Sequence, residues 1–178
     1  VLNDLLHRCL AKERTARFAS VETLLAALAT IYQQQFGRQP TSLAPTETFT
    51  AIDYNNRGMT YLQLARHAEA LADLNQAIRL APEMGPAYAN RGIAWAAQQQ
   101  YEAALTDHNH ALQLDPHNPP LYAGRGDTYR QMARYTEALA DYNQALTLDP
   151  DYAQAYYNRG NTYYQLESYE QALADHTR

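Results

Sequence analysis

The sequence predicts an all-α fold, a solenoid of antiparallel helix hairpins stacked along the chain. One observation is a glycine that recurs every 34 residues, and the other is a set of aromatic and alanine residues that keep the same period. A fixed period of this length is typical of stacked hairpins, in which each unit buries its apolar face against its neighbours. The four glycines, each preceded by a tyrosine four residues earlier, are Gly58, Gly92, Gly126 and Gly160.

Each unit is expected to hold two helices, because its apolar positions recur at intervals of three and four residues. The glycine lies inside the first helix, where it costs about 1 kcal/mol relative to alanine. Four such costs indicate a packing reason, namely the close approach of the second helix. The alanines on the second helix indicate the same crossing, which a larger side chain would overpack: Ala70, Ala104, Ala138 and Ala172.

Prolines are expected to mark the end of each second helix, since proline cannot continue a helix and disfavours the α conformation in the residue before it. They are Pro82, Pro116 and Pro150. The predicted units are residues 51–84, 85–118, 119–152 and 153–178, and the last unit stops before its terminal alanine and proline.

The order of aromatic, small, aromatic, alanine, alanine and proline positions over 34 residues resembles the tetratricopeptide repeat. The resemblance covers roughly residues 51–178 and implies a right-handed solenoid whose first helices line a concave, protein-binding face. The residues of this chain that match the family's groove positions are Asn55, Asn56, Met59, Asn90, Ile93, Asp127, Arg130, Tyr157, Asn158, Asn161 and Tyr164. Met59, Ile93, Tyr157 and Tyr164 are the candidate anchors for a partner.

These groove residues also indicate what is bound. Family members that clamp the acidic C-terminal tails of chaperones use lysine, arginine and asparagine in the groove, and only Asn90 fits that pattern, so a carboxylate clamp is not expected. Asn56, Asn90 and Asn158 form a row that Gly124 interrupts. Because an amide donates and accepts, such a row can pair with the backbone of an extended peptide. A similar row of asparagines lines the superhelix of the O-GlcNAc transferase repeat domain. The alternative is that these amides are solvated or bond locally.

An arginine precedes each glycine, and an aspartate recurs on each second helix. They are Arg57, Arg91, Arg125 and Arg159, and Asp73, Asp107, Asp141 and Asp175. We interpret them as a pair that links the two helices of each unit, because the two charges recur together and cancel. The alternative is a basic stripe for acidic partners.

Neither a metal site nor an enzyme active site is predicted. His108 and His110 are two residues apart and diverge by about 200° on a helix. His108 occupies the packing position of Leu74 and Tyr142, so it is interpreted as a core residue. The glycines at 124 and 126 lie in a predicted helix and form no phosphate-binding loop, and the fragment is expected to bind no cofactor.

Composition restricts the class of partner and the location. The net charge of −5 argues against nucleic acid, since it provides no basic footprint for phosphates. The single cysteine, Cys9, excludes an internal disulfide and suits a reducing compartment, so a cytoplasmic location is expected. The longest apolar run, residues 24–31, is far too short to form a membrane segment.

Residues 1–32 do not follow the repeat and are expected to form two helices, the second capped by Ser20. The run Leu5-Leu6-His7-Arg8-Cys9-Leu10, with Arg17 and residues 20–28, resembles the C-terminal end of a eukaryotic-like serine/threonine protein kinase domain. Glu13-Arg14 departs from that family, which has an acidic residue and proline there. The resemblance implies that ATP and Mg²⁺ bind only in an upstream kinase domain. Residues 33–50 have the composition of a linker.

The function expected from these features is a protein–protein interaction scaffold that forms the C-terminal part of a serine/threonine protein kinase. Two alternatives stay open. Residues 1–32 can instead be a helical cap of a solenoid that has no connection with a kinase. The truncated fourth unit can also drive self-association, because terminal repeats normally need a polar outer face.

Overall fold

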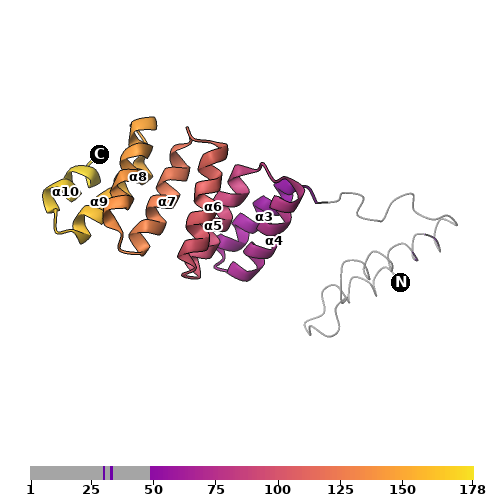
Figure 1. Ribbon diagram of the computed structural model, residues 1–178. Coiled ribbons are helices and arrows are strands. Elements are labelled where there is room, and N and C mark those ends of the chain that lie inside the picture. The colour runs from indigo at the N-terminus through magenta and orange to yellow at the C-terminus, as the bar shows by residue number, and fades with distance from the viewer. Residues whose placement is uncertain (1–29, 31–32, 34–48) are drawn as a thin grey trace, which may run out of the picture. The chain divides into compact units, whose positions relative to one another are not determined.

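The computed structural model describes Thr30, Gln33 and residues 49–178. The kinase-like helices expected in residues 1–32 and most of the linker expected in residues 33–50 lie outside the described residues. Residues 49–178 coincide with a compact unit, Phe49–Arg178. This unit contains eight helices and no strand, which confirms the all-α prediction for the described part of the chain (Figure 1).

The helices form four successive hairpins, which Figure 1 shows side by side in chain order from indigo to yellow. The hairpins are α3 and α4, α5 and α6, α7 and α8, and α9 and α10. Their bounds are α3 Ala51–Gln63, α4 His67–Leu80, α5 Gly85–Ala97, α6 Tyr101–Leu114, α7 Pro119–Gln131, α8 Tyr135–Leu148, α9 Ala153–Gln165 and α10 Tyr169–His176.

The sequence explains where the helices begin and end. α3 begins with a capping box, in which the Thr50 side chain accepts from the Asp53 backbone N–H and the Asp53 carboxylate accepts from the Thr50 N–H at 2.9 Å. α5 and α7 carry proline in their first two positions, where its missing N–H costs nothing. As predicted, the second helices α4, α6 and α8 end two residues before a proline.

The predicted reason for the buried glycines is confirmed. A Cβ atom added to Gly58 would lie 2.8 Å from Cγ of Leu74, and one added to Gly126 would lie 2.9 Å from Cε1 of Tyr142. Each glycine therefore leaves room for the large side chain that the facing second helix inserts. The alanines predicted at the crossing, Ala70, Ala104 and Ala138, are completely buried.

His108 takes the place of Leu74 and Tyr142 in the second hairpin, as predicted, and is 1 % exposed. A Cβ atom on Gly92 would lie 2.9 Å from its ring, and neither ring nitrogen has a hydrogen-bond partner. Burial, with a smaller contribution from the charge of Arg125, lowers the pKa of His108 to about 4. The imidazole is therefore neutral at physiological pH and behaves as a core side chain with two unsatisfied nitrogens.

The turn inside each hairpin contains one residue with a left-handed backbone. These residues are Ala65, Gln99, Ala133 and Glu167, with φ between 54° and 61°. They keep the 34-residue period but share no chemistry, so the sequence analysis did not find them. A left-handed conformation costs an L-residue about 1–2 kcal/mol, whereas glycine adopts it readily.

Ala65→Gly and Ala133→Gly are therefore expected to stabilise the array, each by up to about 1 kcal/mol. The relief of backbone strain exceeds the extra chain entropy that glycine brings to the unfolded state, about 0.5–1 kcal/mol. Urea denaturation followed by circular dichroism measures the change. Ala140→Gly, at an exposed position inside α8, is the control and should lose about 1 kcal/mol. Equal losses at positions 65 and 140 would contradict the strain argument.

Candidate functional site

The first helices of the hairpins line the inner side of the array. Each of α3, α5 and α7 contacts the first helix of the following hairpin directly. The extensive contacts of α4, α6 and α8 are instead with the first helices of their own and the following hairpin. Since the first helices lie closer together, the array curves toward them, and the groove residues predicted from the sequence lie on these helices.

Four predicted groove residues expose large apolar or aromatic side chains. Met59 is 44 % exposed and Ile93 is 46 % exposed, on α3 and α5. Tyr157 and Tyr164 on α9 are 56 % and 60 % exposed. Roughly half of each side chain is therefore open to solvent. The Tyr157 ring also lies 5.6 Å from the His176 ring of α10. Asn56 is also exposed, whereas Arg130 and Asn161 are half-buried.

Two asparagines of the row, Asn90 and Asn158, form side-chain hydrogen bonds to the preceding hairpin. Asn90 donates from Nδ2 to Oδ1 of the buried Asn55 at 2.9 Å. Asn158, also buried, donates to Oδ2 of Asp127 at 3.0 Å and accepts from Gln154 Nε2 at 2.9 Å. Local bonding, the alternative considered for these amides, is therefore present at Asn90 and Asn158. The partners could not be foreseen, because they lie on different positions of the neighbouring helix.

A hollow of about 370 Å³ opens between α5 and α7, where Gly124 interrupts the asparagine row. Gly124 contributes no side chain to this space, and a Cβ atom added to it would contact Cε1 of His108 at 3.4 Å. The interruption of the asparagine row is visible in the sequence, but the hollow is not predicted by it. Its lining comes from Ile93, Ala96, Ala97, Gly124, Asp127, Thr128 and Gln131.

Asp127 is the only carboxylate in the lining of this hollow, and its two oxygens are held by neutral donors. Oδ1 accepts from the Tyr142 hydroxyl at 2.7 Å, and Oδ2 accepts from Asn158. Nη2 of Arg130 lies 3.6 Å from Oδ1. Burial raises the pKa of Asp127, while the Tyr142 hydrogen bond and the Arg130 charge oppose that rise. The carboxylate is thus fixed in direction and only partly neutralised.

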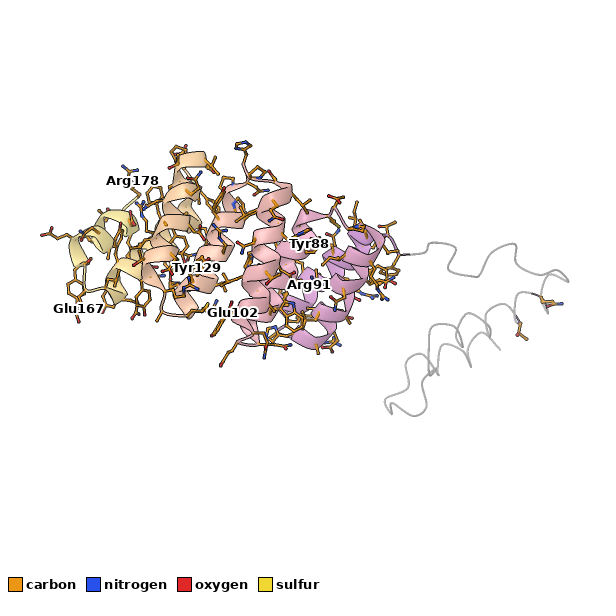
Figure 2. The ribbon with its side chains drawn as sticks, in the orientation of Figure 1. Tyr88, Arg91, Glu102, Tyr129, Glu167 and Arg178 are labelled. Carbon is orange, nitrogen blue, oxygen red and sulfur yellow. The ribbon has the colours of Figure 1, made fainter. Side chains whose placement is uncertain are left out.

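The predicted Arg–Asp pairs are confirmed in all four hairpins. Arg91 donates from Nε and Nη2 to the two oxygens of Asp107, both at 2.7 Å, and the Asp107 side chain is only 7 % exposed. The Arg91 guanidinium also lies over the Tyr88 ring, 5.4 Å from its centroid (Figure 2). These arginines hold the fold together, which leaves no basic stripe for acidic partners.

Each arginine after the first also reaches the preceding hairpin. Nη1 of Arg91, Arg125 and Arg159 donates at 2.6–2.7 Å to an asparagine on the second helix before it. The sequence analysis missed these partners, although they too recur every 34 residues: Asn75, Asn109 and Asn143. One side chain therefore connects three helices at every junction between hairpins.

No described helix combines the length and the hydropathy needed to cross a bilayer. Within the same residues, no group of three or more histidine, cysteine, aspartate or glutamate side chains is placed to hold a metal ion.

Comparison with known proteins identifies the repeat. The family model for the tetratricopeptide repeat matches residues 51–84 and 85–118. A second model, described as TPR repeat, matches residues 126–167. A search of curated protein sequences found no match.

Solved structures share this fold. The first TPR domain of human RPAP3 is 23 % identical, with a TM-score of 0.63, and the match covers 68 % of this chain and 95 % of that one. A crystal structure of MamA is 17 % identical, with a TM-score of 0.62 and coverage of 88 % and 85 %. The first TPR of Spaghetti (RPAP3), bound to the HSP90 peptide SRMEEVD, is 23 % identical, with a TM-score of 0.58 and coverage of 72 % and 96 %. Since the two family models together match more than half of the residues, the chain belongs to the tetratricopeptide repeat family.

Proposed function

We propose that the chain is a protein–protein interaction scaffold whose groove binds an extended peptide or protein segment. The observation that carries the proposal is the series of exposed apolar and aromatic side chains on the first helices: Met59, Ile93, Tyr157 and Tyr164. Exposed apolar groups surrounded by polar ones are typical of interaction sites, and aromatic residues supply a large share of binding energy. The fold is shared with the Spaghetti domain, which was solved with a bound peptide.

The chemistry of the groove favours a neutral or basic ligand. The peptide bound to Spaghetti, SRMEEVD, ends in a segment with three acidic side chains and a terminal carboxylate. Residues 49–178 of this chain contain no lysine, and the one basic side chain at the predicted groove positions, Arg130, already lies beside Asp127. The groove therefore lacks the cations that an acidic tail requires.

Two asparagines of the row, Asn56 and Asn90, are still able to bind the backbone of a peptide. An amide offers four hydrogen-bonding sites, and the bond from Asn90 to Asn55 uses one of them. Asn56 is exposed and Asn90 is half-buried, so both can also meet the backbone of an extended peptide. Asn158 is buried and bonded on both sides, so it contributes to the wall of the groove rather than to the ligand.

Peptides selected by the full chain from a displayed library of random 12-residue peptides test the proposal. Ile93→Ala and Tyr157→Ala are each expected to weaken the selected peptides at least tenfold in fluorescence anisotropy, because anchor residues commonly contribute more than about 1.4 kcal/mol. Leu80→Ala is the matched control. Leu80 is 50 % exposed but lies on a second helix, and its replacement should leave affinity unchanged. Failure to select any peptide, or an equal loss with Leu80→Ala, would overturn the groove.

We also propose that the array belongs to the C-terminal part of a serine/threonine protein kinase. The support is the resemblance carried by residues 5–10, Arg17 and residues 20–28. ATP and Mg²⁺ would then bind in the kinase domain and not in the repeats, and a cytoplasmic location goes with this proposal. Reading the coding sequence upstream of Val1 is the test. If it lacks the glycine-rich loop and the two catalytic-domain aspartates, the kinase connection is wrong.

Self-association through the fourth hairpin is the second candidate, and one observation favours it. Leu173 on α10 is 65 % exposed and offers an apolar side chain for such a contact. Head-to-tail stacking is disfavoured, because it would bury Asp53, which stands where Ala87 stands in the next hairpin. The contact would therefore join two α10 faces. A constant mass in light scattering across a concentration series would refute it.

A further inference from the structure

We propose that the hollow between α5 and α7 binds a lysine or arginine side chain of the peptide partner. This inference rests on the proposed function, since it specifies one residue of the ligand that the groove would hold. It makes the array selective for one basic position within an otherwise permissive extended segment.

The shape of the hollow fits a long side chain. One wall is formed by Ile93, Ala96 and Ala97 of α5, and Gly124 on α7 adds no side chain to the space of about 370 Å³. A lysine or arginine buries its methylene stem against apolar surface while its charged end reaches a polar group. An acidic side chain of a ligand has a shorter stem and would bring its charge toward Asp127.

The charge of the hollow selects among the side chains that fit. Tyr142 and Asn158 donate one hydrogen bond each to the Asp127 carboxylate, which can accept about four. Arg130 forms an ion pair with Oδ1 at 3.6 Å, which still leaves acceptor positions of the carboxylate unused. Asp127 can therefore accept from a further cation inside the hollow. The net charge of −5 also favours the approach of a basic peptide.

The register shows that this selectivity belongs to one site. The residues equivalent to Asp127 in the other hairpins are Met59, Ile93 and Asn161, none of which is charged. The equivalents of Gly124 are all asparagines, and the side chains of Asn90 and Asn158 each reach the preceding first helix. A carboxylate and an opening thus coincide only in the third hairpin, so a single basic residue is expected rather than a basic stretch.

The test uses peptides selected by the full chain from the random 12-residue library. Lysine or arginine should predominate at one position, and replacing it with norleucine should weaken binding at least tenfold. Asp127→Asn should weaken the lysine peptide to a similar extent and leave the norleucine peptide unchanged. That non-additivity isolates the contact between Asp127 and the basic side chain from any general loss of affinity.

A second variant covers the case in which Asp127→Asn perturbs the fold through Tyr142. Ala97→Phe fills the hollow from an exposed position at the end of α5, and should weaken the lysine peptide at least tenfold. Gln165→Phe, at the same position of α9 and also exposed, should not. Selected peptides without a basic preference, or equal binding by the Ala97→Phe and Gln165→Phe proteins, would overturn this inference and leave the groove standing. If no peptide is selected at all, the proposed function itself fails.

Discussion

Asp107→Ala is expected to destabilise the array by about 2–3 kcal/mol, although it removes a single hydrophilic side chain. Asp107 accepts two hydrogen bonds from Arg91, and its side chain is 7 % exposed. Breaking a buried ion pair costs about 3–5 kcal/mol, since the partner keeps its desolvation cost without compensation. The Arg91 side chain is 21 % exposed and keeps its bond to Asn75, so the expected loss lies at or below the lower end of that range.

Urea denaturation of the wild-type and variant proteins measures this loss, with an exposed pair as the control. Glu137 pairs with Arg134 at 2.7 Å, but both side chains are more than 40 % exposed. Glu137→Ala should therefore change stability by no more than about 1 kcal/mol. If Asp107→Ala lowers the free energy of unfolding as little as the control does, the buried Arg–Asp pair does not stabilise the fold.

Acidification is expected to destabilise the second hairpin through His108. The pKa of this imidazole is about 4 in the folded protein and about 6.5 in the unfolded chain, so the unfolded state binds more protons between these values. The contribution of His108 to stability is therefore fully present above about pH 6.5 and is lost as the pH falls toward 4. The loss between pH 7.5 and pH 4 is about 3 kcal/mol, from 1.36 kcal/mol per pKa unit.

His108→Leu isolates this effect. The variant should lose about 3 kcal/mol less than the wild type over the same pH range, in parallel urea titrations. It should also be more stable at pH 7.5 by about 1–3 kcal/mol, since leucine fills the equivalent site at Leu74 and leaves no unpaired ring nitrogen. His117→Leu, which removes an imidazole at an exposed turn position, is the control. Superimposable wild-type and His108→Leu profiles would rule out the buried imidazole as the cause.

The sequence was sufficient for the features that one repeat determines by itself. The period of the glycines predicted the crossing of the two helices. Comparison of equivalent positions predicted that His108 is a core residue, because Leu74 and Tyr142 occupy the same position in their own hairpins. The Arg–Asp pairs were predictable for the same reason, because both partners belong to one hairpin and recur together.

Features that depend on two hairpins were harder to predict. Asn90 and Asn158 occupy the same place in the register, yet one bonds to Asn55 and the other to Asp127, because the preceding helix offers different acceptors. The hollow likewise needs Gly124 on one helix and small residues on another. The left-handed turn residues were not predicted, because they share a backbone conformation but no side-chain type that the sequence would reveal.

The arginines that bridge successive hairpins have a consequence for how the array comes apart. When one hairpin unfolds, the arginine of the following hairpin loses its asparagine hydrogen-bond acceptor. Adjacent hairpins should therefore unfold together rather than one by one. Arg57 has no earlier second helix within the array and stacks instead on Phe49 and Tyr54. Within residues 49–178, amide hydrogen exchange should accordingly be slow in the α5–α6 and α7–α8 hairpins, which are bridged to a neighbouring hairpin on both sides.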